Sequence, residues 1–332
     1  MSQTDTRADE SVQLTADRRA FVNHGFTALT TAAASLILVV LAAVATFLLT
    51  ESWPAITNAS GTLAEKVSWI KPEAGESLIQ IIGFLVFGTI LIATIALLIA
   101  TPLSIGIALF ISHYAPRKLA AGLGYLIDLL AAIPSVVYGL WGAIVLVPVL
   151  QPFYAWLGQT IGWIPLFAPD PLTGEVSPTG RVALSAGIVL AIMIIPIITA
   201  VSREVFLQTP KLHEEAALAM GATRWEMIRM AVFPFGRSGI IGATMLGLGR
   251  ALGETMAVYM ILSVGLGYSW NILQSSEHNT IASYIAGQFP EANQHGVSAL
   301  IAMGLALFII TLLVNMLARW IVSRRSEFSG AN

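Results

Sequence analysis

Long apolar runs separated by short polar segments dominate the pattern along the chain. A helix that crosses a bilayer needs roughly 20 mostly apolar residues. Six runs meet this length, at residues 26–49, 78–111, 123–150, 182–206, 240–266 and 297–322. The pattern therefore predicts an all-α, polytopic membrane protein with six transmembrane helices.

Two prolines affect the expected course of these runs. Pro102 lies in the second run, where the missing backbone donor predicts a bend or a break near one membrane boundary. Pro134 lies in the third run, which begins in a less apolar stretch and also carries Asp128. We expect the first turns of the third run to lie along the membrane interface before the chain turns inward. For Asp128 itself, contact with lipid headgroups or a neighbouring helix is favoured over a role in a binding site.

Composition agrees with a membrane protein. The chain has 332 residues, of which 56% are hydrophobic and 11% charged, whereas soluble domains usually carry about 25% charged residues. Much of the surface must therefore meet membrane lipid. The absence of Cys excludes disulfides and thiolate metal sites. No Gly-Lys dipeptide occurs, which excludes a P-loop, so any ATP would be hydrolysed by another chain.

The distribution of Lys and Arg predicts the orientation. With a cytoplasmic N-terminus, six spans place the C-terminus in the cytoplasm as well, and 13 of the 17 Lys and Arg residues then lie on the cytoplasmic side. Three lie on the opposite side, and Arg250 lies inside a span. These basic residues form no cluster typical of a nucleic-acid interface, so no nucleic-acid partner is expected.

This topology predicts a division of the chain. It comprises a cytoplasmic N-terminal tail (1–25), a first helix with its external loop (26–77), a transmembrane core (78–322) and a cytoplasmic C-terminal tail (323–332). The N-terminal tail is polar and is expected to lack regular structure. The external segment 151–181 carries five prolines and is expected to be an irregular, stiff cap. The core includes one polar cytoplasmic loop at 208–235.

The loop at 208–235 contains signals for two short helices. Thr209 and Pro210 can start a helix, because Thr caps free amides and Pro is favoured at the first helical position. Gly221 is a natural left-handed stop. Thr223 and Glu226 then fit a capping box, which predicts a second helix that ends at Pro234.

The first of these helices has the side chains of a docking element. Small residues such as Ala216 and Ala217 let a helix sit deep in a groove of a partner, and Glu214 and Glu215 can pair with basic groups there. The alternative is an ordinary helical loop on the membrane surface.

Arg250 and Glu254 are the only strong charges inside the fifth run. An Arg at the bilayer centre costs about 2.5–3.5 kcal/mol on insertion scales, so it requires a partner or a water-filled path. On a continuous helix Glu254 would lie one turn from Arg250 on the same face. Two interpretations stay open: a structural ion pair, or a pair on an anion pathway in which the guanidinium binds phosphate-like oxygens.

The loop and the fifth run both resemble a known family. The sequence Glu215-Ala216-Ala217, followed by Gly221 and by Pro234 thirteen residues later, resembles the coupling loop of type I ABC importer permeases. Ala231 and Phe233 differ from the Ile and Leu usual there, but both are apolar. The segments 236–258, with Arg250-Ala251-Leu252-Gly253-Glu254-Thr255, and 132–140 are similar to the phosphate-specific permeases of the PstC family.

The resemblance implies a function and partners. Such a chain is one of two unlike permease subunits in a phosphate importer of the bacterial cytoplasmic membrane. It binds no cofactor itself, because a dimeric PstB-like ATPase binds ATP and Mg. A PstA-like second permease and an extracytoplasmic PstS-like phosphate-binding protein complete the assembly. The resemblance assigns Arg250 and Glu254 to transport, and Glu215, Ala216, Ala217 and Gly221 to ATPase contact.

Three other functions compete with this interpretation. A permease for another oxyanion, such as sulfate or molybdate, would carry the same Arg. A secondary transporter or channel would move anions without nucleotide or partner. An intramembrane enzyme lacks a nucleophile–base pair or a metal cluster in the sequence, and the scattered histidines, including His113 and His278, are expected to be solvated or interfacial.

Overall fold

The computed structural model describes residues 3–57, 67, 69, 77–171 and 173–323, and only the backbone of residues 3–24, 322 and 323. The described residues form helices joined by loops, with no strand among them. Contacts divide the chain into two units, Met1–Ser52 and Trp53–Asn332.

The first unit consists of helix α1 (Gln3–Thr57), whose last turn belongs to the second unit. The helix begins at Gln3, so the expectation of an irregular N-terminal tail is wrong for these residues. From Phe26 to Leu49 its large apolar side chains are exposed. A stretch of this length and composition can cross a bilayer, as the sequence predicts.

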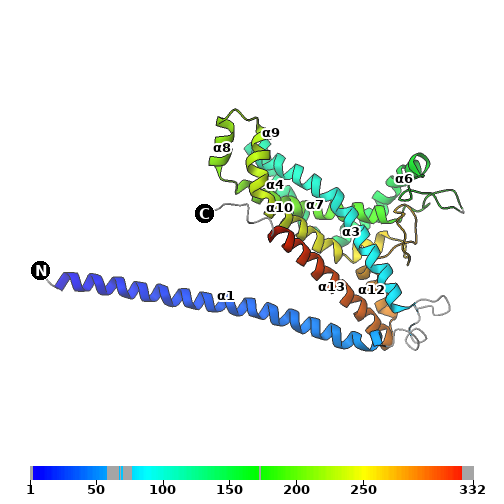
Figure 1. Ribbon diagram of the computed structural model, residues 1–332, viewed down its shortest axis with the longest axis horizontal. Helices are drawn as coiled ribbons and strands as arrows, with labels where there is room; N and C mark the ends of the chain where they lie inside the picture. The colour runs from blue at the N-terminus through cyan, green and yellow to red at the C-terminus, as the bar shows by residue number, and fades with distance from the viewer. Residues whose placement is uncertain (1–2, 58–66, 68, 70–76, 172, 324–332) are drawn as a thin grey trace. The chain divides into compact units, whose positions relative to one another are not determined.

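The second unit is a bundle of helices, several of them interrupted (Figure 1). In chain order it contains α3 (Leu78–Leu109), η2 (Phe110–Tyr114), α4 (Arg117–Ala131), α5 (Ser135–Trp141), η3 (Gly142–Leu146), α6 (Val147–Ile161), α7 (Ala183–Leu207), α8 (Lys211–Ala219), α9 (Arg224–Met227), η4 (Ile228–Val232), α10 (Phe233–Leu252), α11 (Met256–Ile261), α12 (Ile281–Gln288), η5 (Phe289–Glu291) and α13 (Gln294–Ser323). The segments η2, η3 and η4 are π-helical turns, and η5 is a 3₁₀ turn.

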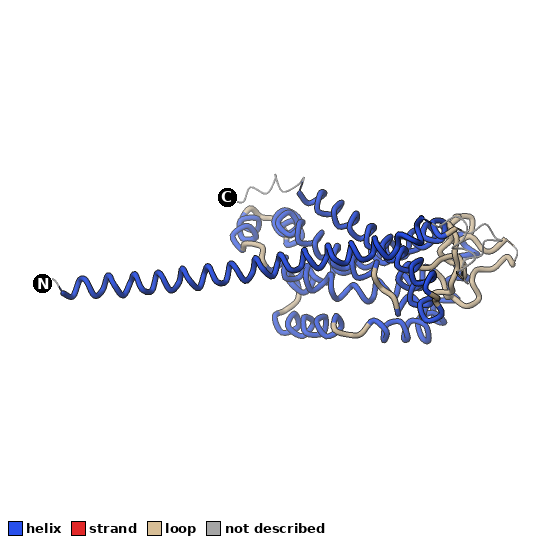
Figure 2. Tube along the Cα trace, turned by 90° about the horizontal axis from the view of Figure 1, so that it is seen from below, coloured by secondary structure: helices blue, strands red, loops and turns tan. Residues whose placement is uncertain are grey.

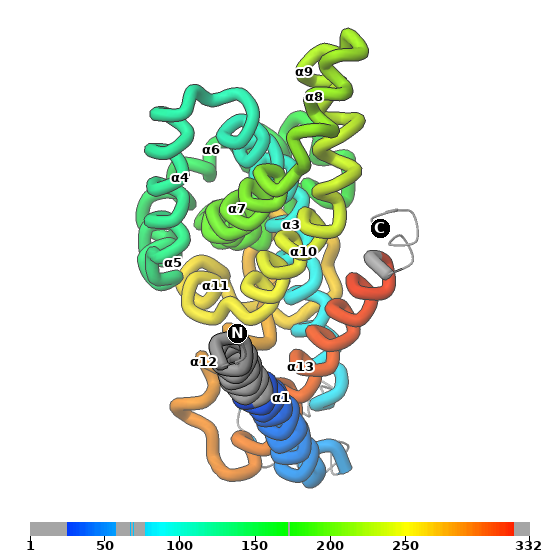
Figure 3. Tube along the Cα trace, turned by 90° about the vertical axis from the view of Figure 1, so that its left-hand side faces the viewer, coloured from blue at the N-terminus to red at the C-terminus, as the bar shows by residue number. Residues whose placement is uncertain are grey.

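Helix α7 lies at the centre of this bundle and packs against α3, α10 and α4 (Figure 3). Small residues allow the close packing: a side chain at Gly187 would collide with Ile95 of α3, and one at Gly247 would crowd Ile198. The main apolar core follows the same helix and includes the fully buried Val189 and Ile194.

Six helices in the described part of the chain are long and apolar enough to span a membrane, as predicted. They are Gly25–Thr57, Leu78–Tyr114, Ser135–Ile161, Ala183–Leu207, Arg224–Leu252 and Gln294–Ile321. The third begins at Ser135 and not at residue 123, because the chain breaks at Pro134 after α4. Helix α6 continues to Ile161, so the start of the expected irregular cap at 151–181 is helical.

The prediction for the fifth span is wrong at both ends. Its helix begins at Arg224, because the π-turn η4 leads directly into α10, and Pro234 occupies the first turn of α10, where a missing donor costs little. Pro234 therefore does not end a helix. At the other end the helix stops at Leu252 and not at 266, and the short α11 follows after a turn.

Pro102 does not break the second span either, since α3 runs through it from Leu78 to Leu109. The span ends in the π-turn η2 instead.

The two ends of the bundle differ. Helices α8 and α9 lie at one end (Figure 1), while most of the loop segments gather at the other (Figure 2). There, loop 262–280 bonds to loop 162–182: Ile272 N donates to Leu166 O at 3.0 Å, and the amide of Asn271 donates to Ala168 O at 2.6 Å. His278 in this loop is only 2% exposed. The loop end is therefore a packed cap.

Candidate functional site

The polar loop at 208–235 folds into two helices with a sharp turn between them, as predicted. Helix α8 runs from Lys211 to Ala219, and Gly221 adopts φ +87°, the left-handed conformation. The capping box is present: Thr223 N donates to Glu226 Oε2 at 2.8 Å, and Glu226 N donates to Thr223 Oγ1 at 3.3 Å. Thr209, however, does not cap α8, because Pro210 occupies the N-cap and receives no side-chain bond.

Helix α8 presents two different faces. Glu215, Ala216 and Met220 are exposed, together with Gly221 in the turn. Ala217 is 5% exposed and packs inward, in an apolar cluster with Phe206 of α7. Glu214 is half-buried. The outer face thus offers small, acidic and apolar groups to the surroundings, whereas Ala217 faces the chain itself.

Arg250 and Glu254 do not form the ion pair that a continuous helix predicts. Helix α10 ends at Leu252, so Glu254 lies in the turn before α11. No described carboxylate lies within ion-pair distance of Arg250. Glu254 is 8% exposed, and its Oε1 accepts a hydrogen bond from Ala257 N at 3.1 Å, which caps the first turn of α11. The self-neutralising ion pair is therefore absent from this conformation.

Arg250 lies where two interrupted helices meet. Its Nε is buried and finds no hydrogen-bond partner among the described groups. Its charge lies close enough to act on the phenol of Tyr138, in α5. Tyr138 Oη donates to Leu130 O at 2.9 Å, across the break between α4 and α5. Helix α11 packs against α5 (Figure 3), so the segment that follows the break in the fifth span lies beside the segment that follows the break at Pro134.

With the ion pair absent, the anion-pathway interpretation of Arg250 stays open. Discontinuous helices in transporters expose backbone groups that can replace water around an ion. A buried, unpaired guanidinium nitrogen leaves hydrogen-bonding capacity that an oxyanion can use. No sequence pattern points to Tyr138; its placement depends on the fold, which packs α5 against α11.

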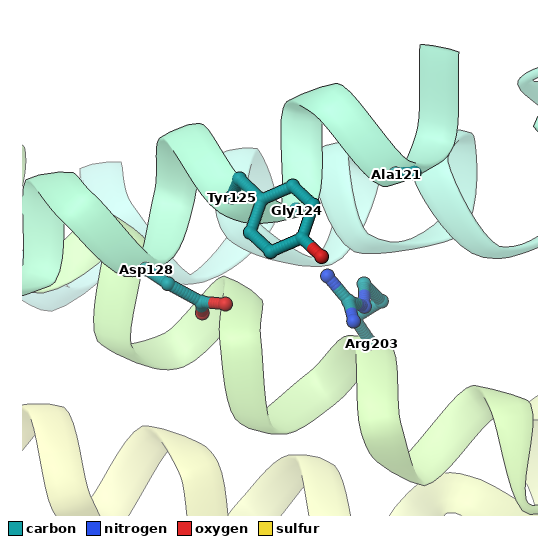
Figure 4. A pocket seen from close by; sticks show the side chains of 5 residues that line it. All are labelled: Ala121, Gly124, Tyr125, Asp128 and Arg203. Atoms are coloured by element: carbon teal, nitrogen blue, oxygen red, sulfur yellow. The ribbon is translucent and has the colours of Figure 1, made fainter. Parts of the chain in front are cut away.

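A second polar place lies in a cleft of about 240 Å³ between α4 and α7. Figure 4 shows the side chains of Tyr125, Asp128 and Arg203 turned toward one another across it, with Ala121 and Gly124 forming the α4 wall. A side chain at Gly124 would collide with the guanidinium of Arg203, so glycine makes room for it. Arg203 already pairs with Glu204 at 2.8 Å. With Asp128 the cleft carries no net positive charge, which disfavours an anion.

Comparison with known proteins identifies the family. Residues 100–327 match the family described as "Binding-protein-dependent transport system inner membrane component". The chain belongs to this family. It is therefore a multi-pass permease of the bacterial inner membrane.

Three curated relatives of this permease are phosphate transport system permease proteins. It is 43% identical over 291 residues to "Phosphate transport system permease protein PstC 2" of Mycobacterium tuberculosis, a match that covers 87% of this chain and 88% of the relative. It is 48% identical to PstC of Mycobacterium leprae, over 71% of this chain and 73% of the relative. PstC of Mesorhizobium japonicum is 38% identical over 96% and 95%.

Solved structures confirm the fold of the permease. The inward-facing MetNI methionine ABC transporter matches with a TM-score of 0.50 at 16% identity, over 73% of this chain and 95% of that one. The type I ABC importer permease fold expected from the sequence is thus confirmed.

The structure also reveals a residue that the sequence interpretation set aside. His113, in η2 of the permease, lies 3.5 Å from Glu214 of α8, measured from Nε2 to Oε1. The histidine had been expected to be solvated or interfacial. Nothing in the sequence pattern relates it to Glu214, because only the packing of α8 against the end of the second span brings the two together.

Proposed function

We propose that this chain is one of two permease subunits of an ATP-driven importer of inorganic phosphate. The observation that carries the proposal is the 43% identity to a phosphate transport permease over 87% of the chain. The geometry supports the proposal through the exposed face of α8 at one end and Arg250 at the interrupted helices.

The missing P-loop and the exposed face of α8 indicate which partners the chain needs. The sequence has no P-loop, so a dimeric ATPase of the PstB kind would bind ATP and Mg and dock against α8 through Glu215, Ala216 and the Gly221 turn. A second, PstA-like permease would complete the pathway, and a PstS-like extracytoplasmic protein would deliver phosphate. The Lys and Arg distribution supports a cytoplasmic location for α8 and both termini.

In this proposal, closure of the ATPase dimer on ATP displaces α8 and opens the permease pair outward. The binding protein then releases phosphate toward Arg250, whose guanidinium stabilises the dianion in passing. Conduction requires that this binding be weak enough for release. Hydrolysis of ATP reverses the movement, and the ion leaves to the cytoplasm. Glu254, which caps α11 beside Arg250, keeps the turn in place and disfavours a second anion.

Uptake by proteoliposomes that contain the complete transporter tests the proposal. We expect phosphate to accumulate only when the binding protein is on the side of the membrane opposite α8 and ATP is on the side of α8. An excess of sulfate or molybdate should leave phosphate uptake unchanged. Transport of sulfate in place of phosphate would assign the chain to another oxyanion. Anion flux through the purified chain alone, without ATPase or nucleotide, would make it a stand-alone transporter and refute the proposal.

A further inference from the structure

One side-chain pair ties α8 to the end of the second span. His113 lies in the π-turn η2, and its Nε2 is 3.5 Å from Oε1 of Glu214. The two side chains are 9% and 23% exposed. On its other side, Nδ1 of His113 lies 2.7 Å from the hydroxyl of Ser112, which also donates to Ala108 O at 2.8 Å. The imidazole is therefore held on both edges, by η2 itself and by α8.

An apolar cluster joins the same two elements. Ala108 and Leu109 from the end of α3 pack with Ala217 of α8, and Phe206, Met227, Ile228 and Val232 complete the cluster. Apolar contacts of this kind are non-directional, so they hold α8 against the bundle without fixing its rotation. The His113–Glu214 contact is directional and lies beside the cluster on α8, one turn before Ala217. Together they fix both the position and the rotation of this nine-residue helix.

The orientation of α8 separates its two adjacent acidic residues. Glu214 is turned toward η2 and is half-buried, whereas Glu215 is exposed beside Ala216. A carboxylate that already faces a histidine of its own chain is a poor contact for a second protein. The sequence interpretation had offered both acids to the partner, and the structure leaves only one of them free to reach it.

We propose that His113 and Glu214 form an internal strut that carries the displacement of α8 to α3, and that Glu215 alone supplies the acidic contact to the ATPase subunit. This proposal rests on the proposed function, since it assigns positioning residues within the same importer. His113 acts through Glu214 and touches neither phosphate nor nucleotide. When α8 moves, the residues of the apolar cluster are displaced with it through their contacts. The His113–Glu214 strut prevents α8 from rotating about its own axis without displacing α3.

The test compares Glu214→Gln with Glu215→Gln in the complete transporter, as matched substitutions on neighbouring residues. We expect Glu214→Gln and His113→Gln to retain the ATPase subunits during purification and to hydrolyse ATP, but to move about two- to fivefold less phosphate per ATP, the range of a partly exposed ion pair. The double variant should be no worse than either single variant. Glu215→Gln should instead weaken retention of the ATPase subunits.

A conservative variant separates the strut from simple packing. His113→Lys supplies a cation that can reach Glu214, so it should restore most of the phosphate moved per ATP that His113→Gln loses, whereas His113→Leu should not. Additive losses in the double variant, failure of Lys to rescue, or release of the ATPase by Glu214→Gln would each overturn the proposal. If the wild-type transporter moved no phosphate, the proposed function would fail. A double-mutant cycle on the thermal unfolding of the complex would then still decide whether the pair holds α8.

Discussion

Substitutions at Gly221 can test how far backbone conformation contributes to coupling, which is the amount of phosphate transported per ATP hydrolysed. Gly221 has φ +87°, and a Cβ added there would meet no atom within 4 Å. Its N–H donates to Leu218 O at 3.0 Å. A substitution that keeps this donor therefore changes only the conformational preference of the residue. Alanine in the left-handed region costs about 1–2 kcal/mol, which corresponds to a roughly 5- to 30-fold shift against the native turn.

Two further substitutions bracket alanine. Asparagine visits the left-handed region more readily, so Gly221→Asn should cost less than Gly221→Ala. Proline is fixed near φ −65° and lacks the N–H, so Gly221→Pro cannot adopt the turn and should cost about 3 kcal/mol or more. We expect phosphate transported per ATP hydrolysed to fall in the order Gly, Asn, Ala, Pro in proteoliposomes that contain the complete transporter.

Gly106→Ala is the matched control. Gly106 lies within α3, and a Cβ there also meets no atom within 4 Å, but its φ is not positive. Alanine should stabilise this helix by about 0.5–1 kcal/mol and leave coupling unchanged. Equal coupling losses for Gly221→Ala and Gly106→Ala, or normal coupling in Gly221→Pro, would show that the left-handed turn has no part in coupling.

Three further predictions concern single side chains. Arg250→Gln should reduce phosphate uptake about 10- to 100-fold, since a hydrogen bond to a charged group contributes about 1.5–3 kcal/mol. The amount of assembled complex should stay constant. Normal uptake would show that Arg250 has only a packing role. Glu254→Gln retains an acceptor for Ala257 N, so it should lower transport more than the yield of protein. Glu254→Ala also loses the cap of α11, which costs about 1 kcal/mol, and should lower the yield as well. A loss of yield in both variants would favour a purely structural role for the carboxylate. Burial lowers the pKa of His278, against the smaller raising effects of the Ser269 carbonyl and of Glu277, so the folded protein favours the neutral ring. Its melting temperature should therefore fall as the pH drops below about 6.5, and His278→Gln should flatten this dependence; an unchanged slope would assign the pH dependence to another group.

Much of the architecture could be predicted from the sequence because lipid imposes a simple rule. Every backbone polar group in hydrocarbon must be satisfied within the segment, so an apolar run of sufficient length forms a helix whatever its neighbours are. The six spans follow from that rule. The local signals of the coupling loop are equally independent of the rest of the fold: Gly221 stops α8, and Thr223 with Glu226 starts α9, through contacts within four residues.

The ends of the spans could not be predicted in the same way. Pro102 and Pro234 both lie within uninterrupted helical segments, whereas the fifth run breaks at Gly253, between Arg250 and Glu254. Hydropathy measures only the preference for lipid and does not distinguish a continuous helix from one interrupted at a polar junction. The ion pair between Arg250 and Glu254, one of the two interpretations left open, is absent for this reason. It requires a continuous helix, whereas α10 ends at Leu252, two residues before Glu254.

The sequence by itself determined that the chain spans a membrane, that a two-helix loop with a left-handed turn lies between the fourth and fifth spans, and that Arg250 is a charge within an apolar run. These properties depend on composition and on contacts between near neighbours. Only the tertiary structure decided which distant groups interact: Tyr138 lies within electrostatic range of Arg250, and His113 lies against Glu214. Such contacts join residues far apart in the chain, and they form because helices pack wherever small residues permit close approach. The information about which helices pack is distributed over several helices and is absent from any one of them.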